Sequence, residues 1–453
     1  MNSARFEKYL ISIVSTICSM NEKQSGLRII LSYSIPGIIS MLLSAALTLT
    51  DGYFTGNHVG EDALAAINLG LPILYVFLGV GLCTGVGGSV ITGHLIGKGD
   101  GRRASEVFTQ SMITSLGMSI IASLLFYNFF DPVLSFLRAE RTLQSYFSDY
   151  YGIMILTYPL LVLNTVSGMF LRTDGRPRLY MMISLSGCVL NFLLDYLFVY
   201  RLQLGVRGSA FATLLVDAIS LALCISCFQR SSGLKLTRFS FDFAMLRTML
   251  LNGLSEFIGE ASSAISMFAF NYVLIKYSGP EGVAAFTILG YSVYAFSMIT
   301  IGFGQGLCPV VSVLCGEGEM EKARRMRNIT MWVLFFIGVI FAALFFFSGE
   351  KFARLFGAGE TVSSFVGRGF RIASAAFLIM GFDVTASMYF TAIGDARSSV
   401  IVSSLRGLIL LIPFTLLFPV LWGLDGIWLV TPITEGLTAS VAYYLIRRDR
   451  IKQ

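Results

Sequence analysis

The chain has 453 residues, of which 55% are hydrophobic and only 13% are charged, whereas soluble globular domains carry about 25% charged residues. Apolar runs of about 20 residues recur along the chain, each long enough to cross a bilayer as a helix, which excludes a soluble protein. The net charge of +6 does not indicate nucleic-acid binding, because the Lys and Arg residues lie in short loops, where positive charge sets membrane topology.

The N-terminal residues 1–28 mix charged and apolar positions and lack a small-residue cleavage site, so we expect a cytoplasmic or interfacial segment and no signal peptide. Twelve transmembrane helices are predicted after it. Their ranges are 29–54, 63–93, 105–129, 147–171, 179–200, 208–228, 248–275, 283–314, 329–348, 367–392, 399–421 and 425–446. The runs show no period-2 alternation, so the pattern predicts an all-α membrane protein.

The chain repeats itself at a shift of 219 residues, which becomes 218 after one residue is lost. We call positions related by this shift repeat counterparts. Glycines of loops and span interiors coincide: Gly60 and Gly279, Gly85 and Gly304, Gly97 and Gly316, and Gly205 and Gly423. Each half holds six spans, an even number, so the two repeats are parallel. Such folds place substrate sites at the interface between the repeats and transport by rocking one half against the other.

The predicted organisation follows from this repeat. It consists of an N-terminal segment (1–28), an N-lobe (29–228), a cytoplasmic linker (229–247), a C-lobe (248–446) and a basic tail (447–453). Of the 33 Lys and Arg residues, 24 lie on the side of the N-terminus. This asymmetry predicts a multi-pass protein of the plasma membrane with both termini in the cytoplasm.

Three motifs accompany the repeat. They are Thr50-Asp51-Gly52-Tyr53-Phe54-x-Gly56, Gly97-x-Gly99 and Asn191-x-x-x-Asp195. Together they resemble the MATE (multidrug and toxic compound extrusion) transporters of the MOP flippase superfamily, over residues 28–446. The resemblance implies a V-shaped, two-lobed bundle around a central cavity, and cation-driven export of amphipathic, often cationic, compounds.

A carboxylate at membrane depth costs at least ~2.5 kcal/mol to insert, so Asp51 at the end of the first span is a functional candidate. Asn191 and Asp195 are four residues apart and share one helix face. The resemblance implies that Asp51, Asn191, Asp195 and Thr213 form a proton or sodium site. Two neighbouring carboxylates repel in a low dielectric, and a bound cation would relieve the repulsion. No cofactor is expected beyond this transported ion, and no metal site.

The C-lobe offers a second set of candidates for coupling or substrate binding: Glu256, Glu260 and Asp383, with Asn164 as the repeat counterpart of Asp383. The resemblance implies that some relatives hold their cation in this lobe, but internal hydrogen bonding remains the alternative. Asp217 and Glu435 are also repeat counterparts, and Arg406 is a candidate partner for such a buried acid.

A cavity for varied organic cations is expected to be rich in Met and aromatic side chains. The candidates are Tyr33, Met41, Tyr158, Met169, Phe170, Met267, Phe268, Tyr291, Met388 and Tyr389. The alternative is that these side chains pack against lipid or other helices.

The leading hypothesis is a secondary antiporter for amphipathic small molecules, acting in the lipid bilayer as a monomer, without nucleic acid. The alternative is a flippase or exporter of one lipid-linked or metabolic substrate on the same scaffold. An enzyme is not expected, because the chain has two His residues and no HExxH, GxSxG or nucleotide-binding loop.

Overall fold

The computed structural model describes residues 22–130, 132, 141–230 and 233–451, so most of the predicted N-terminal segment lies outside the described residues. Within these ranges, eleven helices are long and apolar enough to cross a membrane. The last one, Ala396–Asp449, covers 54 residues and is broken at Gly423, where φ is 57° and ψ is −136°. Since ~20 residues suffice for one crossing, its two arms are two spans. The described chain therefore has twelve spans, as predicted.

The first half of the chain forms the N-lobe. Its elements are α2 (Glu22–His58), α3 (Glu61–Leu69), α4 (Leu71–Gly97), α5 (Gly101–Asn128), α7 (Arg141–Thr173), α8 (Pro177–Asp195), the π-helix η1 (Tyr196–Arg201) and α9 (Gly205–Arg230). The predicted second span is divided at Gly70, which separates α3 from α4. The Tyr151 hydroxyl donates a hydrogen bond to the Ile67 carbonyl oxygen (2.7 Å) beside this break. A Cβ on residue 70 would lie 2.0 Å from the Tyr151 ring, so only glycine fits.

The second half forms the C-lobe. Its elements are α10 (Phe243–Gly316), α11 (Met320–Leu355), α12 (Glu360–Ala373), α13 (Ala375–Ala392), α14 (Ala396–Ser404), the π-helix η2 (Leu405–Ile409) and α15 (Leu411–Ile451). Helix α10 bends at Gly279, where φ is 60°, and Pro280 follows. Its two arms are the predicted seventh and eighth spans. Gly279 and Gly423 both adopt the left-handed region that favours glycine.

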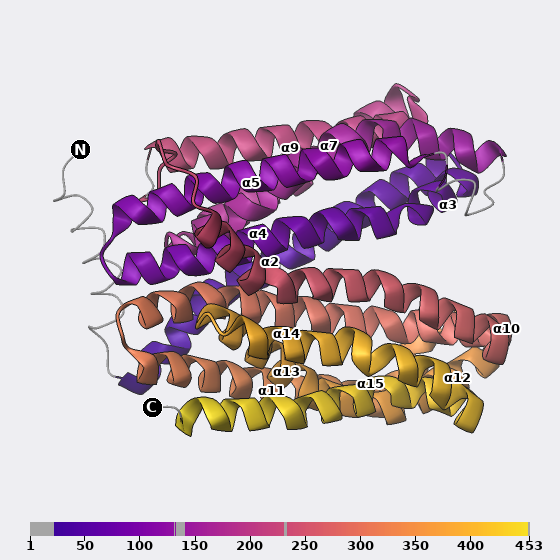
Figure 1. Ribbon diagram of the computed structural model, residues 1–453. Helices are drawn as coiled ribbons and strands as arrows, with labels where there is room; N and C mark the ends of the chain where they lie inside the picture. Colours follow the sequence, from indigo (N-terminus) through magenta and orange to yellow (C-terminus); the bar gives the residue numbers. More distant parts are fainter. Residues whose placement is uncertain (1–21, 131, 133–140, 231–232, 452–453) are drawn as a thin grey trace.

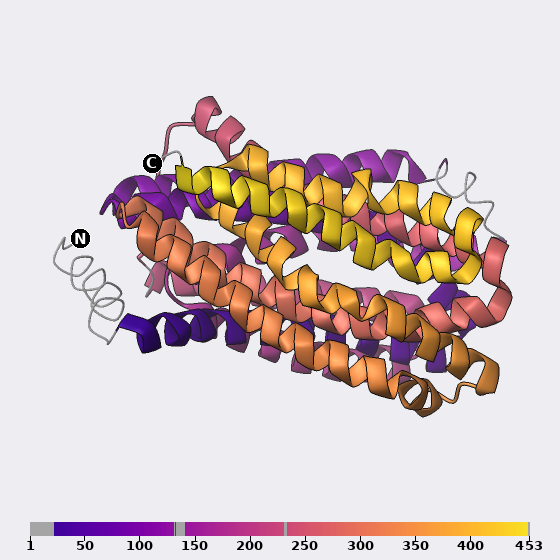
Figure 2. The ribbon, with the colours of Figure 1, turned by 90° about the horizontal axis from the view of Figure 1, so that it is seen from below.

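The two halves lie as two layers of helices that diverge toward the end holding α3 and the bend of α10 (Figure 1). The C-lobe helices cover one whole side of the bundle, and the described ends of the chain lie together at the opposite end (Figure 2). The protein is thus an all-α, V-shaped bundle of two six-helix repeats, which confirms the predicted fold class.

Helix α2 belongs to the N-lobe by sequence but contacts both lobes. Near its middle it lies so close to α10 that a Cβ on Gly37 would be 2.7 Å from the Gly302 carbonyl oxygen. Near its end, the Phe54 ring packs edge-on against Phe192 of α8, with 5.5 Å between centroids. Helix α2 therefore connects the C-lobe directly to the part of the N-lobe that holds Asp51.

The lobes also approach closely at the end with the Gly97 and Gly316 loops. A Cβ on Gly93 of α4 would lie 2.1 Å from Ser312 Oγ, and one on Gly316 would lie 2.2 Å from the His94 carbonyl oxygen. Small residues allow membrane helices to approach in this way. A side-chain hydrogen bond adds to the contact, because His94 Nε2 lies 2.8 Å from the Ala392 carbonyl oxygen of α13.

Candidate functional site

The Asp51 carboxyl is buried between α2, α8 and α9. Thr213 Oγ1 donates a 3.4 Å hydrogen bond to Asp51 Oδ2, and it also donates to the Ser209 carbonyl oxygen (3.2 Å). Asp51 Oδ1 has no hydrogen-bond partner among the described residues. The predicted contact between the first and sixth spans is therefore present, and half of the carboxylate remains unsatisfied.

Asn191 and Asp195 present their side chains to Asp51 from the last turns of α8. Both residues are fully buried. When both acids are ionised, the four polar side-chain atoms of this pair have no hydrogen-bond partner within the described ranges, whereas a proton shared by the Asp51 and Asp195 carboxyl groups would supply one. The π-helix η1 begins directly after Asp195, and π-helical turns often accompany functional sites. The structure thus brings together all four predicted N-lobe residues, which we call the N-lobe cluster.

The N-lobe cluster offers carboxylate, amide and hydroxyl oxygens within one buried space. Unsatisfied buried polar atoms each cost about 1–3 kcal/mol, so they indicate an interaction still to be completed. Oxygen ligands suit hard cations, and two adjacent carboxylates also suit a shared proton. Among the described residues no three His, Cys, Asp or Glu side chains are grouped as a metal site would need.

Tyr150 of α7 lies within electrostatic range of both Asp51 and Asp195, although the sequence interpretation did not include it. Its side chain is buried, and its ring packs at 5.0 Å against that of Tyr151. A tyrosine in a long apolar run carries no local signal of this contact. Only the packing of α7 against α8 and α9 brings it to the N-lobe cluster.

Asp383 does not join Glu260, although both were predicted for one C-lobe site. The charged neighbours of Asp383 are Glu435 and Arg406. Arg406 Nε donates a 2.8 Å hydrogen bond to Glu435 Oε1, which confirms Arg406 as the partner of that buried acid. In the N-lobe, the partner of Asp217 is Asn164 instead of a basic residue.

Glu256 and Glu260 lie on the first arm of α10, where it packs against α4 of the other lobe. Glu260 neighbours Tyr75 and Tyr294. These tyrosines are repeat counterparts, so they approach Glu260 from equivalent places in the two lobes. Because both repeats carry a tyrosine at this position, the sequence could have identified Tyr75 and Tyr294 as candidate site residues. Glu256 is a neighbour of Cys83 and Cys308.

Five of the predicted cavity residues are packed inside the lobes. They are Tyr158, Met169, Phe170, Met388 and Tyr389. Tyr158 stacks on Phe77 with 4.3 Å between centroids. The Tyr389 ring lies 4.5 Å from the Arg327 guanidinium, and its hydroxyl donates to Asp449 Oδ2 (3.0 Å). These side chains fill the cores of the lobes and do not line an open space in this structure.

The other predicted cavity residues lie nearer the surface of the lobes. Met267, Phe268 and Tyr291 are exposed, and Tyr33 and Met41 are half-buried. Tyr291 stacks on Phe356 of its own lobe. Met41 lies at the contact between the lobes, where Gln305 Nε2 is 3.8 Å from its sulfur. Sequence reasoning missed Gln305, because a single amide in an apolar run has no distinctive spacing.

A family model described as MatE matches residues 36–197 and 257–417, one segment in each half of the chain. A multidrug export protein MepA of Staphylococcus haemolyticus is 26% identical over 435 residues, covering 94% of both chains. A crystal structure of MATE in the bent conformation superposes with a TM-score of 0.89 at 24% identity, covering 100% of this chain and 98% of that one. An outward-facing structure of a multidrug resistance MATE family transporter of the MOP superfamily gives 0.87 at 25% identity, covering 94% and 96%.

Proposed function

This chain belongs to the MatE family of membrane transporters, and from that premise we propose that it exports amphipathic, cationic compounds by proton or sodium antiport. The relative from Staphylococcus haemolyticus, a multidrug export protein, supports the export of drugs. The N-lobe cluster supports the coupling. Its buried, unsatisfied oxygens around Asp51 are the observation that carries the proposal.

We assign cation binding to Asp51, Asn191, Asp195 and Thr213. A proton or sodium ion there would satisfy oxygens that have no other described partner. Binding shifts a two-state equilibrium only if the ion prefers one arrangement of the lobes. Helix α2 would couple ion binding to the arrangement of the lobes, because it contacts both the N-lobe cluster and α10 of the C-lobe.

We assign substrate recognition to the face where the lobes meet around Glu260. The Glu260 carboxylate, which lies within electrostatic range of Tyr75 and Tyr294, would attract an organic cation by charge, and the two aromatic rings would add to the attraction. Glu256 lies one helical turn away on the same face of α10. Met41 of α2 and the second-arm residue Gln305 of α10 also lie where the two lobes meet. A flippase for an anionic lipid-linked substrate would need a cationic face here, so we place that alternative second.

We also propose an orientation in the membrane. We place both termini in the cytoplasm of a plasma-membrane monomer, with an N-lobe of 29–228 and a C-lobe of 248–446 joined by the linker 229–247. In this orientation the contact between His94 and Ala392 closes the cytoplasmic end. The lobes then diverge toward the outside.

The test uses the purified chain in sealed vesicles loaded with a fluorescent cationic dye. A proton gradient and a sodium gradient are imposed separately, and dye efflux is followed for the wild type, Asp51→Asn and the exposed control Asp62→Asn. We expect one gradient to drive efflux in the wild type and the control, and Asp51→Asn to abolish it. Gradient-driven efflux that survives in Asp51→Asn would remove Asp51 from coupling. Absence of dye transport by the wild type would favour the flippase.

A further inference from the structure

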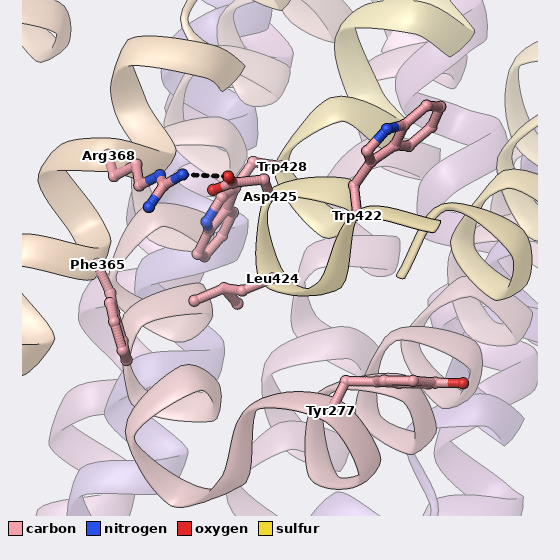
Figure 3. A pocket seen from close by; sticks show the side chains of 7 residues that line it. All are labelled: Tyr277, Phe365, Arg368, Trp422, Leu424, Asp425 and Trp428. Carbon is pink, nitrogen blue, oxygen red and sulfur yellow. Dashed lines mark hydrogen bonds and ion pairs between the residues drawn. The ribbon is translucent and has the colours of Figure 1, made fainter. Parts of the chain in front are cut away.

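A pocket of about 360 Å³ opens at the end of the C-lobe away from the termini, between α12 and the bends at Gly279 and Gly423. Besides Leu424, its walls are aromatic and charged side chains: Tyr277, Phe365, Trp422, Trp428, Arg368 and Asp425. In Figure 3 the Arg368 guanidinium and the Asp425 carboxylate lie beside the Trp428 indole, and Tyr277 lies across the pocket from them. The volume is near the lower end for small-molecule sites, ~300–1,000 Å³.

Trp428 is the feature of this pocket that points to a ligand. Its side chain is 2% exposed, yet its Nε1 has no hydrogen-bond partner among the described residues. A buried indole N–H normally finds an acceptor. The Trp428 indole lies on the same side of the pocket as the Arg368 guanidinium (Figure 3). An indole donor and a guanidinium together suit an anionic group, and phosphate matches the guanidinium geometry.

The pocket also carries a negative charge, on the Asp425 carboxylate. Asp425 pairs with Arg368, and both keep part of their side chains exposed, 30% and 66%. A carboxylate beside aromatic faces suits an ammonium group. A ligand with adjacent positive and negative groups would thus exchange the internal ion pair for two pairs of its own.

The repeat shows which of these features the scaffold itself requires. The repeat counterparts of Arg368 and Asp425 are Asp149 and Arg207, which form the same ion pair with the charges reversed, at 2.6 Å. The counterparts of Trp422 and Trp428 are Leu204 and Ala210. The ion pair is therefore a property of both lobes, whereas the two tryptophans occur only in the C-lobe.

Trp428 also takes part in packing, which is the competing explanation. A Cβ on Gly369 would lie 3.0 Å from its ring, and the N-lobe counterpart of Gly369 is Tyr150. In the C-lobe the large ring is therefore Trp428 of α15, opposite Gly369. In the N-lobe it is Tyr150 of α7, opposite Ala210. Packing accounts for a large aromatic ring at 428, but it does not account for an indole N–H without a partner or for the exposed Trp422 that also lines the pocket.

We propose that this pocket binds the headgroup of a zwitterionic phospholipid of the phosphoethanolamine type. The phosphate lies against Arg368 and the Trp428 indole N–H, and the ammonium lies against Asp425 and the aromatic rings. The acyl chains remain in the bilayer. Tryptophan and tyrosine gather at the level of the headgroups in membrane proteins, where Trp422 and Tyr277, 53% and 37% exposed, would meet such a lipid.

The experiment is native mass spectrometry of the full chain in detergent, titrated with dihexanoyl phosphatidylethanolamine. The matching phosphatidylglycerol lacks the ammonium group, and O-phosphoethanolamine lacks the acyl chains. We expect one saturable site for the ethanolamine lipid. Phosphatidylglycerol should bind about tenfold more weakly, as for the loss of one charged hydrogen bond. O-phosphoethanolamine should also bind more weakly, because it lacks the apolar contacts of the acyl chains. Equal binding of phosphatidylglycerol, or binding of O-phosphoethanolamine as tight as that of the lipid, would overturn the proposal.

Two variants separate recognition from folding. Trp428→Phe keeps an aromatic ring, smaller than the indole, and removes the donor. Arg368→Gln removes the guanidinium. Each variant should weaken binding about tenfold. Arg207→Gln is the matched control, because it breaks the equivalent ion pair in the N-lobe without touching the pocket. Unchanged binding in Trp428→Phe, or an equal loss in Arg207→Gln, would contradict the assignment.

Discussion

Asn164 donates hydrogen bonds from Nδ2 to both the backbone oxygen and Oδ1 of Asp217, each at 2.9 Å. The repeat counterparts of these two residues are Asp383 and Glu435, which also lie side by side. The fourth and sixth spans therefore meet at equivalent positions in both lobes. In the N-lobe an amide contacts an acid there, and in the C-lobe two acids lie together with Arg406.

Arg406→Met should destabilise the C-lobe at neutral pH. It leaves two adjacent buried carboxyls without their cation, and breaking a buried pair costs about 3–5 kcal/mol. We expect the lower end, because the Arg406 side chain is 29% exposed. The loss should shrink as the pH falls, since protonation removes the repulsion between the acids. Thermal unfolding in detergent between neutral and acidic pH measures both effects, and a loss that does not depend on pH would contradict this explanation.

Asp383→Asn should leave the stability of the protein intact. It reproduces in the C-lobe the amide–acid contact that Asn164 and Asp217 already make in the N-lobe. The expected change in the free energy of unfolding is below about 0.5 kcal/mol, or is stabilising. If stability holds but gradient-driven efflux is lost, Asp383 has a role in transport beyond the packing of its lobe.

Thr213→Val should shift ion coupling, because it removes the hydroxyl that donates to Asp51 while keeping the branched shape. Losing this donor removes stabilisation of the ionised carboxylate, so affinity for a proton should rise about tenfold, whereas affinity for sodium should fall about tenfold because one oxygen ligand is lost. The sodium concentration or the pH at which efflux is half-maximal measures this shift. Thr213→Ser, which retains the hydroxyl, is the control and should behave like the wild type. Equal behaviour of the Val and Ser variants would exclude the hydroxyl from the site.

Glu260→Gln should reduce affinity for cationic dyes about tenfold and leave neutral substrates unaffected, because only the charge is lost. Competition of cationic and neutral compounds for binding to the purified chain gives the comparison. Tyr75→Phe and Tyr294→Phe keep the aromatic faces, so they should retain cation binding. An equal loss of affinity for both substrate types would indicate a packing defect in place of charge recognition.

His94→Leu should loosen the end where the lobes meet, since it removes the hydrogen bond to Ala392. A typical hydrogen bond contributes about 1 kcal/mol, which corresponds to roughly a fivefold change in population. Spin labels at the exposed residues Lys98 and Arg397, one in each lobe, report their separation. We expect a larger share of long distances in the variant, and an unchanged distribution would exclude His94 as a latch.

The sequence alone determined the features that depend on local pattern. Span lengths, loop charges and the 219-residue shift predicted twelve helices in two parallel halves. The i,i+4 spacing placed Asn191 and Asp195 on one face, and the resemblance joined them to Asp51 and Thr213. These features survive because hydrocarbon requires every spanning segment to satisfy its own backbone as a helix.

Tertiary structure alone decided which side chains meet. The sequence could not show that Asp383 pairs with Glu435 instead of Glu260, or that Tyr150 reaches the N-lobe cluster. Nor could it show that Tyr158, Phe170 and Tyr389 are packed inside the lobes. In a helix that is apolar all round, no amphipathic stripe fixes which face is buried. The rotation of each helix about its axis is set by packing against its neighbours. A uniformly apolar sequence gives little indication of that rotation.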